Sequence, residues 1–176
     1  MEVYEPSDDS YFFAEFLKKY LKKNRPKNYL DIGCGSGILA KTVSKFFEKE
    51  NILCVDINPS AVSATRLLGF KTIKSNLFSK VPKKIFFDLI TFNAPYLPEG
   101  EYEPKDSMLI TTGGKKGDEI SLKFLKQAKE HLTEHGKILL LISSLTPMDE
   151  IEKFKPKILA KRKIFFEELR ILEFRK

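Results

Sequence analysis

The chain has 176 residues, 42% of them hydrophobic, and its 31 basic and 24 acidic residues give a net charge of +7. This length suits one sizeable core and hardly two, so we expect a single domain over residues 1–176. No apolar run is long enough to cross a bilayer and the first residues are acidic, which excludes a membrane-spanning class and predicts a soluble, unexported protein.

The first predicted element is an amphipathic helix that begins near Ser7. Ser7 and the acidic residues that follow it suit a helix start. Its apolar residues fall on one helical stripe, formed by Phe12, Phe13, Phe16, Leu17, Tyr20 and Leu21. A basic group follows on the same segment, with Lys18, Lys19, Lys22, Lys23, Arg25 and Lys27. We interpret this group as a solvated helix face rather than a nucleic-acid contact.

A glycine loop follows a short apolar strand predicted at residues 29–32. The loop reads Asp31-Ile32-Gly33-Cys34-Gly35-Ser36-Gly37, and a helix is predicted from Leu39 to Glu48. Glycines let the backbone turn tightly under a ligand before the helix starts. The next strand, at 52–55, ends at Asp56, roughly twenty residues past the loop, where an acid can bind ribose hydroxyls. The pattern predicts a nucleotide-like ligand, although the loop alone also fits a turn with a helix cap.

The remaining segments alternate between strands and helices. Helices are predicted at 59–67, 119–132 and 148–159, with Pro59 at the first helical position. Strands are predicted at 70–74, 87–91 and 138–142, and the segments near 164–166 and 169–174 are expected to pair as a closing antiparallel hairpin. Together these elements predict an α/β fold with a doubly wound, mostly parallel seven-stranded sheet and helices on both faces.

The strand predicted at 87–91 is followed closely by Asn93-Ala94-Pro95-Tyr96. A strand that ends in Asn, a small residue, Pro and an aromatic suits a pocket that holds a planar amide or amine against an electrophilic methyl group. Beside a cofactor loop, this favours N-methylation. Taken alone, Asn93 is equally well explained as a hydrogen-bonding cap at the end of a strand.

Several motifs together resemble known methyltransferases. The loop form Asp-x-Gly-x-Gly-x-Gly has its third glycine too early for the dinucleotide fingerprint and resembles that of the class I S-adenosylmethionine (SAM) methyltransferases. Three further motifs are Tyr-Glu-Pro-x-x-Asp-Ser at 4–10, Asn-x-Pro-Tyr at 93–96 and Gly-Gly-x-x-Gly at 113–117. Together with the loop, they make the chain resemble the HemK/PrmC family of glutamine methyltransferases from Tyr4 to about Glu119. The resemblance implies a single Rossmann-like domain, with a covering N-terminal segment at 1–25 and a catalytic core at 26–176.

The family resemblance also implies a reaction and its partners. It implies SAM as the methyl donor, S-adenosylhomocysteine as the product, and as substrate the glutamine of the Gly-Gly-Gln loop in a class I translation release factor. The chain is similar to the short eukaryotic and archaeal branch, which lacks an extra N-terminal helical domain and works with a small zinc-binding activator. The strand between Phe70 and Lys74 is expected at the edge of the sheet, where such a partner could add its own strand.

By resemblance, the cofactor-binding residues are Ser10, Asp31, Gly33, Gly35, Gly37, Asp56, Asn76, Leu77 and Asn93. Asp31 is expected near the charged amino acid end of SAM, and Asn76 with Leu77 beside the adenine. The catalytic residues are Asn93, Ala94, Pro95 and Tyr96. Oxygens of Asn93 and Ala94 are expected to accept the N–H bonds of the substrate amide, while Tyr96 packs on its plane.

Two positions depart from the family pattern. Asn76 stands where Asp is usual, and its carbonyl oxygen can still serve the adenine amine, so the departure bears on cofactor affinity. Ala94 stands where Pro is usual, which keeps the carbonyl acceptor but loses a fixed φ. Pro95 still restricts Ala94 to extended conformations. The stretch between Leu97 and Thr112 is polar and long, which suits a loop that faces the substrate.

Other interpretations stay open. The exocyclic amine of adenine in DNA or RNA presents the same planar N–H pair, although no separate target-recognition domain is evident. A protein lysine and a SAM-binding module without catalysis are lesser alternatives. No catalytic metal is expected, because His131 and His135 lack the zincin Glu and suit a surface helix. Cys34 and Cys54 form neither a disulfide framework nor a metal quartet, so a reducing cytoplasm is expected.

Overall fold

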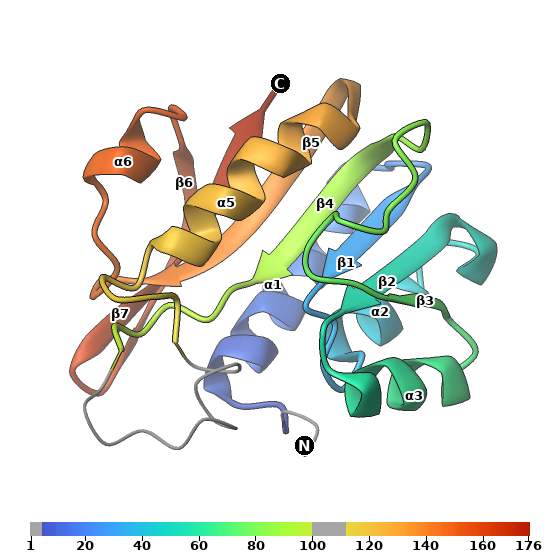
Figure 1. Cartoon of the computed structure of the whole chain (residues 1–176), viewed down its shortest axis with the longest axis horizontal. Helices are drawn as coiled ribbons and strands as arrows, with labels where there is room; N and C mark the ends of the chain where they lie inside the picture. The colour runs from blue at the N-terminus through green and yellow to red at the C-terminus, as the bar shows by residue number, and fades with distance from the viewer. Residues whose placement is uncertain (1–4, 100–111) are drawn as a thin grey trace.

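The computed structural model describes residues 5–99 and 112–176, which form an α/β domain around one twisted sheet (Figure 1). The seven strands have the order β3-β2-β1-β4-β5-β7-β6. They are β1 (Tyr29–Ile32), β2 (Ile52–Asp56), β3 (Lys71–Lys74), β4 (Phe87–Asn93), β5 (Leu132–Ser143), β6 (Lys157–Ile164) and β7 (Glu167–Arg175). The first five are parallel and β7 is antiparallel to both of its neighbours. The predicted mostly parallel seven-stranded sheet is confirmed.

The chain reverses its direction across the sheet at β1. From β1 it adds β2 and β3 on one side, and it then crosses back to add β4 and β5 on the other. The loops that follow β1 and β4 therefore run in opposite directions, and a crevice forms between them at the carboxyl ends of these strands. Open α/β sheets bind their ligands in such a crevice. All residues of β1 and β2 are buried, as expected for parallel strands covered on both faces.

Helices cover both faces of the sheet. In Figure 1, α5 (Glu119–Ala128) crosses in front of the sheet, and α1 (Asp8–Lys23) lies behind it. One core cluster joins side chains of α5 and α6 (Asp149–Glu152) to the sheet, and the other joins α1 and α2 (Ile38–Val43) to its opposite face. Because side chains alternate along a strand, Leu30 belongs to the α5 cluster and Tyr29 to the α1 cluster.

The local signals for helix starts agree with the structure. In α1 the predicted apolar stripe is buried or half-buried, and the six residues of the basic group are exposed. Helix α3 (Pro59–Leu67) has the predicted bounds, with Pro59 at the first helical position. Its cap, Asn58, accepts a hydrogen bond from the backbone N–H of Ser60 at 2.9 Å. Short 3-10 turns, η1 (Lys49–Asn51) and η2 (Lys129–His131), precede β2 and β5.

The helix predicted at 148–159 is wrong. Only α6, with four residues, is helical there, and β6 already begins at Lys157. Pro156 explains the difference, because proline cannot continue the hydrogen bonding of a helix and disfavours a right-handed helical residue before it. Lys155, which precedes it, has a φ of 55°. The predicted closing hairpin exists as β6 and β7, but Phe165 and Phe166 form its exposed turn rather than part of a strand.

The two histidines do not share a surface helix, which corrects that expectation. Helix α5 ends at Ala128, and β5 starts early because Leu132 pairs with Phe87 of β4. His131 is buried, and its Nδ1 lies 3.1 Å from the carbonyl oxygen of Ile85. His135 is exposed within β5. Across the described parts of the chain, no three His, Cys, Asp or Glu side chains gather as they would to hold a metal ion.

At the edges of the sheet lie β3 and β6, so the predicted outer position of the strand near 70–74 is confirmed. Within residues 5–99 and 112–176, every helix is too short or too polar to span a membrane.

Candidate active site

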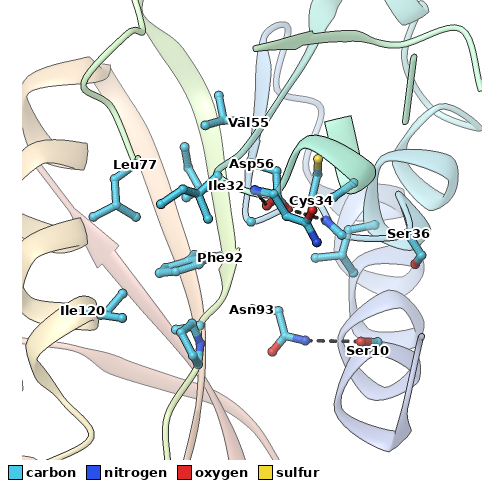
Figure 2. A pocket seen from close by; sticks show the side chains of 18 of the residues that line it. Ser10, Ile32, Cys34, Ser36, Val55, Asp56, Leu77, Phe92, Asn93 and Ile120 are labelled. Carbon is cyan, nitrogen blue, oxygen red and sulfur yellow. Dashed lines mark hydrogen bonds between the residues drawn. The ribbon is translucent and has the colours of Figure 1, made fainter. Parts of the chain in front are cut away.

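A cavity of about 330 Å³ opens where the sheet reverses direction, at the carboxyl ends of β1, β2 and β4 (Figure 2). Its wall contains most of the expected site residues, namely Ser10, Gly33, Gly35, Asp56, Asn76, Leu77, Asn93, Ala94, Pro95 and Tyr96. Asp31 and Gly37 are the two expected residues outside the wall. A volume of this size is within the range of small-molecule sites. Expected cofactor and acceptor residues therefore share one cavity.

The glycine loop has the backbone shape that its sequence requires. Gly33 has a φ of +64°, and a Cβ built on it would lie 2.9 Å from the ring of Phe92, which also lines the cavity. Only glycine adopts this conformation without strain. The backbone N–H of Cys34 donates to the carbonyl of Val55 at 3.1 Å, which ties the loop to β2. Gly37 has a φ of +78° and caps α2, so its contribution is to helix packing rather than to the wall.

Asp56 is held by two backbone donors. Its Oδ2 accepts from the N–H of Gly35 and its Oδ1 from the N–H of Asn58, both at 2.8 Å. Burial raises the pKa of Asp56, while these hydrogen bonds act in the opposite direction. Each carboxylate oxygen has a second lone pair, so Asp56 can also accept from a hydroxyl group in the cavity. The acid at the tip of β2 is thus fixed by the loop that precedes it.

Asp31 lies inside the sheet rather than in the cavity wall. It is 1% exposed, and its Oδ1 accepts from the hydroxyl of Thr91 on the adjacent strand at 3.0 Å. Thr91 in turn shares a short hydrogen bond with Tyr29. The Oδ2 of Asp31 has no hydrogen-bond partner among the described residues. Burial is the main cause that raises the pKa of Asp31 from 3.8 to about 7.

Leu77 shapes the wall opposite the glycine loop. It follows β3 and has a φ of 49°, a left-handed conformation that is uncommon for a residue with a side chain. Such strain costs roughly 1–3 kcal/mol and is found most often at functional sites. Leu77 is 8% exposed, and Figure 2 shows it on the same side of the cavity as Ile120. Asn76, beside it, is exposed at the rim.

Asn93 lies at the far end of the cavity and is oriented by α1. Its Nδ2 donates to Oδ2 of Asp9 at 2.9 Å and to Oγ of Ser10 at 3.3 Å. A carboxylate can only accept, so the nitrogen of the carboxamide must face Asp9. The Oδ1 of Asn93 is buried and has no hydrogen-bond partner among the described residues. Figure 2 shows the nitrogen directed toward Ser10 and the oxygen on the opposite side.

The Gly-Gly-x-x-Gly segment supports the loop that follows Asn93. A Cβ on Gly113 would lie 2.7 Å from the carbonyl oxygen of Pro95, and one on Gly117 would lie 2.8 Å from that of Tyr96. The N–H of Gly113 donates to the carbonyl of Leu97 at 2.8 Å. The glycines are therefore needed for close approach of two backbones, which gives this motif a role in positioning the acceptor residues.

Among the cavity residues that were not assigned to the site from sequence, Asp9, Ile120 and Lys123 lie outside the glycine loop and the strand ends. Asp9 reads locally as an acid at a helix start, and Ile120 and Lys123 of α5 carry no motif of their own. Only for Asp9 was a signal present, as the acid of the Tyr-Glu-Pro-x-x-Asp-Ser pattern. Tyr4 of that pattern lies outside the described residues, as does most of the predicted substrate-facing loop between Leu97 and Thr112.

Comparisons with known proteins identify the family of this chain. Residues 12–166 match the model of the methyltransferase small domain family. A Methanocaldococcus jannaschii protein, provisionally named a protein N5-glutamine methyltransferase, is 38% identical over 97% of this chain and 90% of its own length. The eRF1 methyltransferase catalytic subunit of Schizosaccharomyces pombe is 28% identical over 77% of this chain and 70% of its own.

Bacterial relatives are longer than the matched segment. This chain spans 30 to 54% of the length of the bacterial release factor glutamine methyltransferases that it matches. Among solved structures, the ribosomal protein L11 methylase of Lactobacillus delbrueckii subsp. bulgaricus superposes with a TM-score of 0.68 at 19% identity, over 99% of this chain and 82% of its own. At that identity the likeness concerns the fold alone.

Proposed function

We propose that this chain methylates a glutamine side chain in a release factor. The chain belongs to the methyltransferase small domain family and, within it, to the protein N5-glutamine methyltransferases. The proposed target is the glutamine of the Gly-Gly-Gln loop of a class I factor, in line with the names of the bacterial and S. pombe relatives. One observation carries the proposal most directly. The Oδ1 of Asn93 is buried, has no hydrogen-bond partner within residues 5–99 and 112–176, and lies in the same cavity as a cofactor-type glycine loop.

The residues of the cavity fit SAM. The apolar side chains of Ile32, Val55 and Leu77 suit an adenine ring, and Asp56 at the tip of β2 suits ribose hydroxyls. Gly33 has no side chain that would collide with the ring of Phe92, which lines this region. The Oδ2 of Asp31, for which the described part of the chain offers no hydrogen-bond partner, is a candidate acceptor behind the loop for the positive end of the cofactor. When bound, SAM supplies a methyl group on a positively charged sulfur and leaves as S-adenosylhomocysteine.

The protein's own share of the chemistry is mainly positioning. An amide nitrogen is a poor nucleophile, because its lone pair is delocalised into the carbonyl. The Oδ1 of Asn93 would accept one N–H of the substrate amide and the carbonyl of Ala94 the other, while Tyr96 packs on the amide plane. Holding reactants in such a geometry can be worth roughly 7–11 kcal/mol.

These acceptors also favour the transition state over the ground state. As the nitrogen gains positive charge, its N–H bonds become stronger donors, so hydrogen bonds to Asn93 and Ala94 strengthen. No strong base is needed before transfer, and the proton leaves the nitrogen afterwards. Ala94 is 3% exposed and lines the cavity, so the position that departs from the family pattern still belongs to the wall.

The test is to locate the methyl group by mass spectrometry. The protein is incubated with SAM and either a Gly-Gly-Gln release factor, the same factor with Gly-Gly-Asn, or adenine-containing DNA and RNA. A methyl on the glutamine alone, absent with Asn93→Ala, supports the proposal. A methyl on adenine would overturn the glutamine assignment, because an exocyclic amine presents the same N–H pair. No transfer to any acceptor, with the candidate activator present, would also overturn it.

A second subunit on β3 belongs to the same proposal. The S. pombe relative is named a catalytic subunit, which implies another chain in that enzyme. Here β3 is an outer strand, and Leu67 at the end of α3 is 90% exposed close to it. Arg66 already donates to the carbonyl oxygen of Thr72 in β3, at 2.8 Å, so an added strand would have to displace it or pair beside it. We propose that a small zinc-binding activator adds a strand there.

The two cysteines are in the reduced form that is expected in the cytoplasm, where translation factors act. Cys34 and Cys54 are both buried and free. Disulfides are rare in the cytosol, where thiols stay reduced. We therefore place the proposed reaction in the cytoplasm.

A further inference from the structure

Asp9 is buried although it belongs to the first turn of a helix. It is 7% exposed, whereas its neighbour Asp8 is exposed. Its Oδ1 accepts from the backbone N–H of Ser10 at 2.6 Å and from the hydroxyl of Ser7. Its Oδ2 accepts from Nδ2 of Asn93 at 2.9 Å. An acid that served only the helix dipole would need neither this burial nor a contact with a residue 84 positions away.

We propose that Asp9 is a positioning residue that fixes which end of the Asn93 carboxamide faces the substrate. The carboxylate holds the nitrogen of Asn93 and so leaves the oxygen for an N–H of the methyl acceptor. This inference rests on the proposed function, because it assumes that Asn93 receives an amide N–H.

Ser10 cannot set the orientation by itself. Its hydroxyl lies 3.3 Å from Nδ2 of Asn93 and can act as donor or acceptor, so it would accommodate either orientation of the carboxamide. A carboxylate can only accept hydrogen bonds. If the carboxamide of Asn93 were reversed, its Oδ1 would face the Oδ2 of Asp9, and no hydrogen bond could form between them. The choice between the two orientations therefore belongs to Asp9.

Replacing Asp9 by Asn should reverse the carboxamide. The carboxylate has an acceptor at both ends, one for the N–H of Ser10 and one for Asn93. A carboxamide has only one acceptor end. The backbone N–H of Ser10 cannot rotate, so it would take the oxygen of Asn at position 9, whose NH₂ would then face Asn93. Asn93 would turn its own oxygen to that NH₂ and present its nitrogen to the substrate.

The experiment compares Asp9→Asn with Asp8→Asn. Both remove one negative charge from the first turn of α1, but only Asp9 contacts Asn93. We expect kcat/KM for a Gly-Gly-Gln substrate to fall roughly 10- to 100-fold in Asp9→Asn, with the Kd for SAM changed less than about threefold. Asp8→Asn should match the wild type. Equal kcat/KM in the two variants, or a loss of SAM affinity as large as the loss of transfer, would overturn the proposal.

Two further measurements test the orientation of Asn93 independently of the substrate and of any folding defect in the variant. Nuclear Overhauser contacts of the Nδ2 protons of Asn93 should run to α1 in the wild type and be lost in Asp9→Asn, whatever the substrate is. Contacts that stay the same would overturn the orientation claim. Asp9→Glu keeps a carboxylate and should retain more transfer than Asp9→Asn, and the reverse order would contradict the inference.

Discussion

The two ends of the cavity differ in how their polar groups are satisfied. At the tip of β2, both oxygens of Asp56 accept from backbone N–H groups of the chain itself. At the end of β4, the nitrogen of Asn93 is held by Asp9, but its buried oxygen has no partner in the described structure. Buried polar atoms are rarely left without a hydrogen bond. Asp56 is therefore held in place before a ligand arrives, whereas Asn93 still has a buried acceptor for a donor from outside.

The two ends also differ in the sequence distance of their contacts. Asp56 bonds to residues 21 and 2 positions away, whereas Asn93 bonds to residues 84 and 83 positions away. The end at the tip of β2, which we call the cofactor end, is thus built from one βαβ unit. The end at Asn93, which we call the acceptor end, joins the N-terminal helix to the middle of the chain. If this division holds, substitutions at the two ends should affect different steps.

The largest expected effect is at Asn93. Asn93→Ala should lower the rate of methyl transfer by roughly 1,000-fold, because the substrate amide loses its oriented acceptor. The Kd for SAM should change little, since Asp56 and the glycine loop are untouched. Single-turnover assays and calorimetry check both quantities. A variant that loses SAM binding as strongly as transfer would remove the distinction between the two ends.

Asp56→Ala should have the opposite profile and a smaller effect. The change removes the acceptor expected for ribose and leaves the N–H groups of Gly35 and Asn58 without their partner, so the Kd for SAM should rise roughly 10- to 100-fold. At saturating SAM the transfer rate should recover to near that of the wild type. Calorimetry followed by a SAM titration of the rate measures this. A rate that stays low at saturation would place Asp56 in the transfer step.

Gly113→Ala should weaken transfer by roughly tenfold without weakening SAM binding. The new Cβ would collide with the carbonyl oxygens of Gly117 and Pro95, which should displace the loop that follows Asn93. Gly69→Ala is the control, because it also replaces a glycine by alanine but acts far from this loop. Gly69 has a φ of +85°, so its substitution strains the backbone there. If the two variants lost transfer equally, general destabilisation rather than loop displacement would be the cause.

The last prediction concerns the stability of the protein without SAM, which should depend on the titration of Asp31. Its folded pKa of about 7 lies above its ordinary value of 3.8, so between these values the folded state holds a proton that the unfolded state has released. The free energy of unfolding should therefore fall as the pH rises from about 4 to 7, by up to about 4 kcal/mol for this group. Asp31→Asn should flatten that dependence in denaturant titrations, and an unchanged slope would contradict it.

The sequence predicted the elements whose signals are local. The bounds of β1 and α3 follow from apolar runs and from Pro59, and the place of Asp56 follows from its spacing to the glycine loop. The helix expected at 148–159 failed because Pro156 outweighs an approximate helical period. The shared helix of His131 and His135 failed because pairing with β4 draws the chain into β5 early.

The acceptor end was only partly predictable for a physical reason. The tetrapeptide at 93–96 identified the residues, but the orientation of Asn93 depends on Asp9, which a local pattern assigns to a helix start. Likewise, the glycines at 113 and 117 owe their role to the backbone of Pro95 and Tyr96, which lies close to them only in the folded chain. The family motifs singled out Asp9 and these glycines, but the contacts that they make with distant segments leave no local pattern in the sequence.

The most direct test of how Asn93 receives the methyl acceptor is a crystal structure with S-adenosylhomocysteine and a Gly-Gly-Gln peptide. We expect the glutamine nitrogen to lie within hydrogen-bond distance of Oδ1 of Asn93, roughly 2.7–3.2 Å, while Nδ2 of Asn93 stays hydrogen-bonded to Asp9. A glutamine bound elsewhere in the cavity, or an Asn93 whose nitrogen faces the peptide, would contradict it.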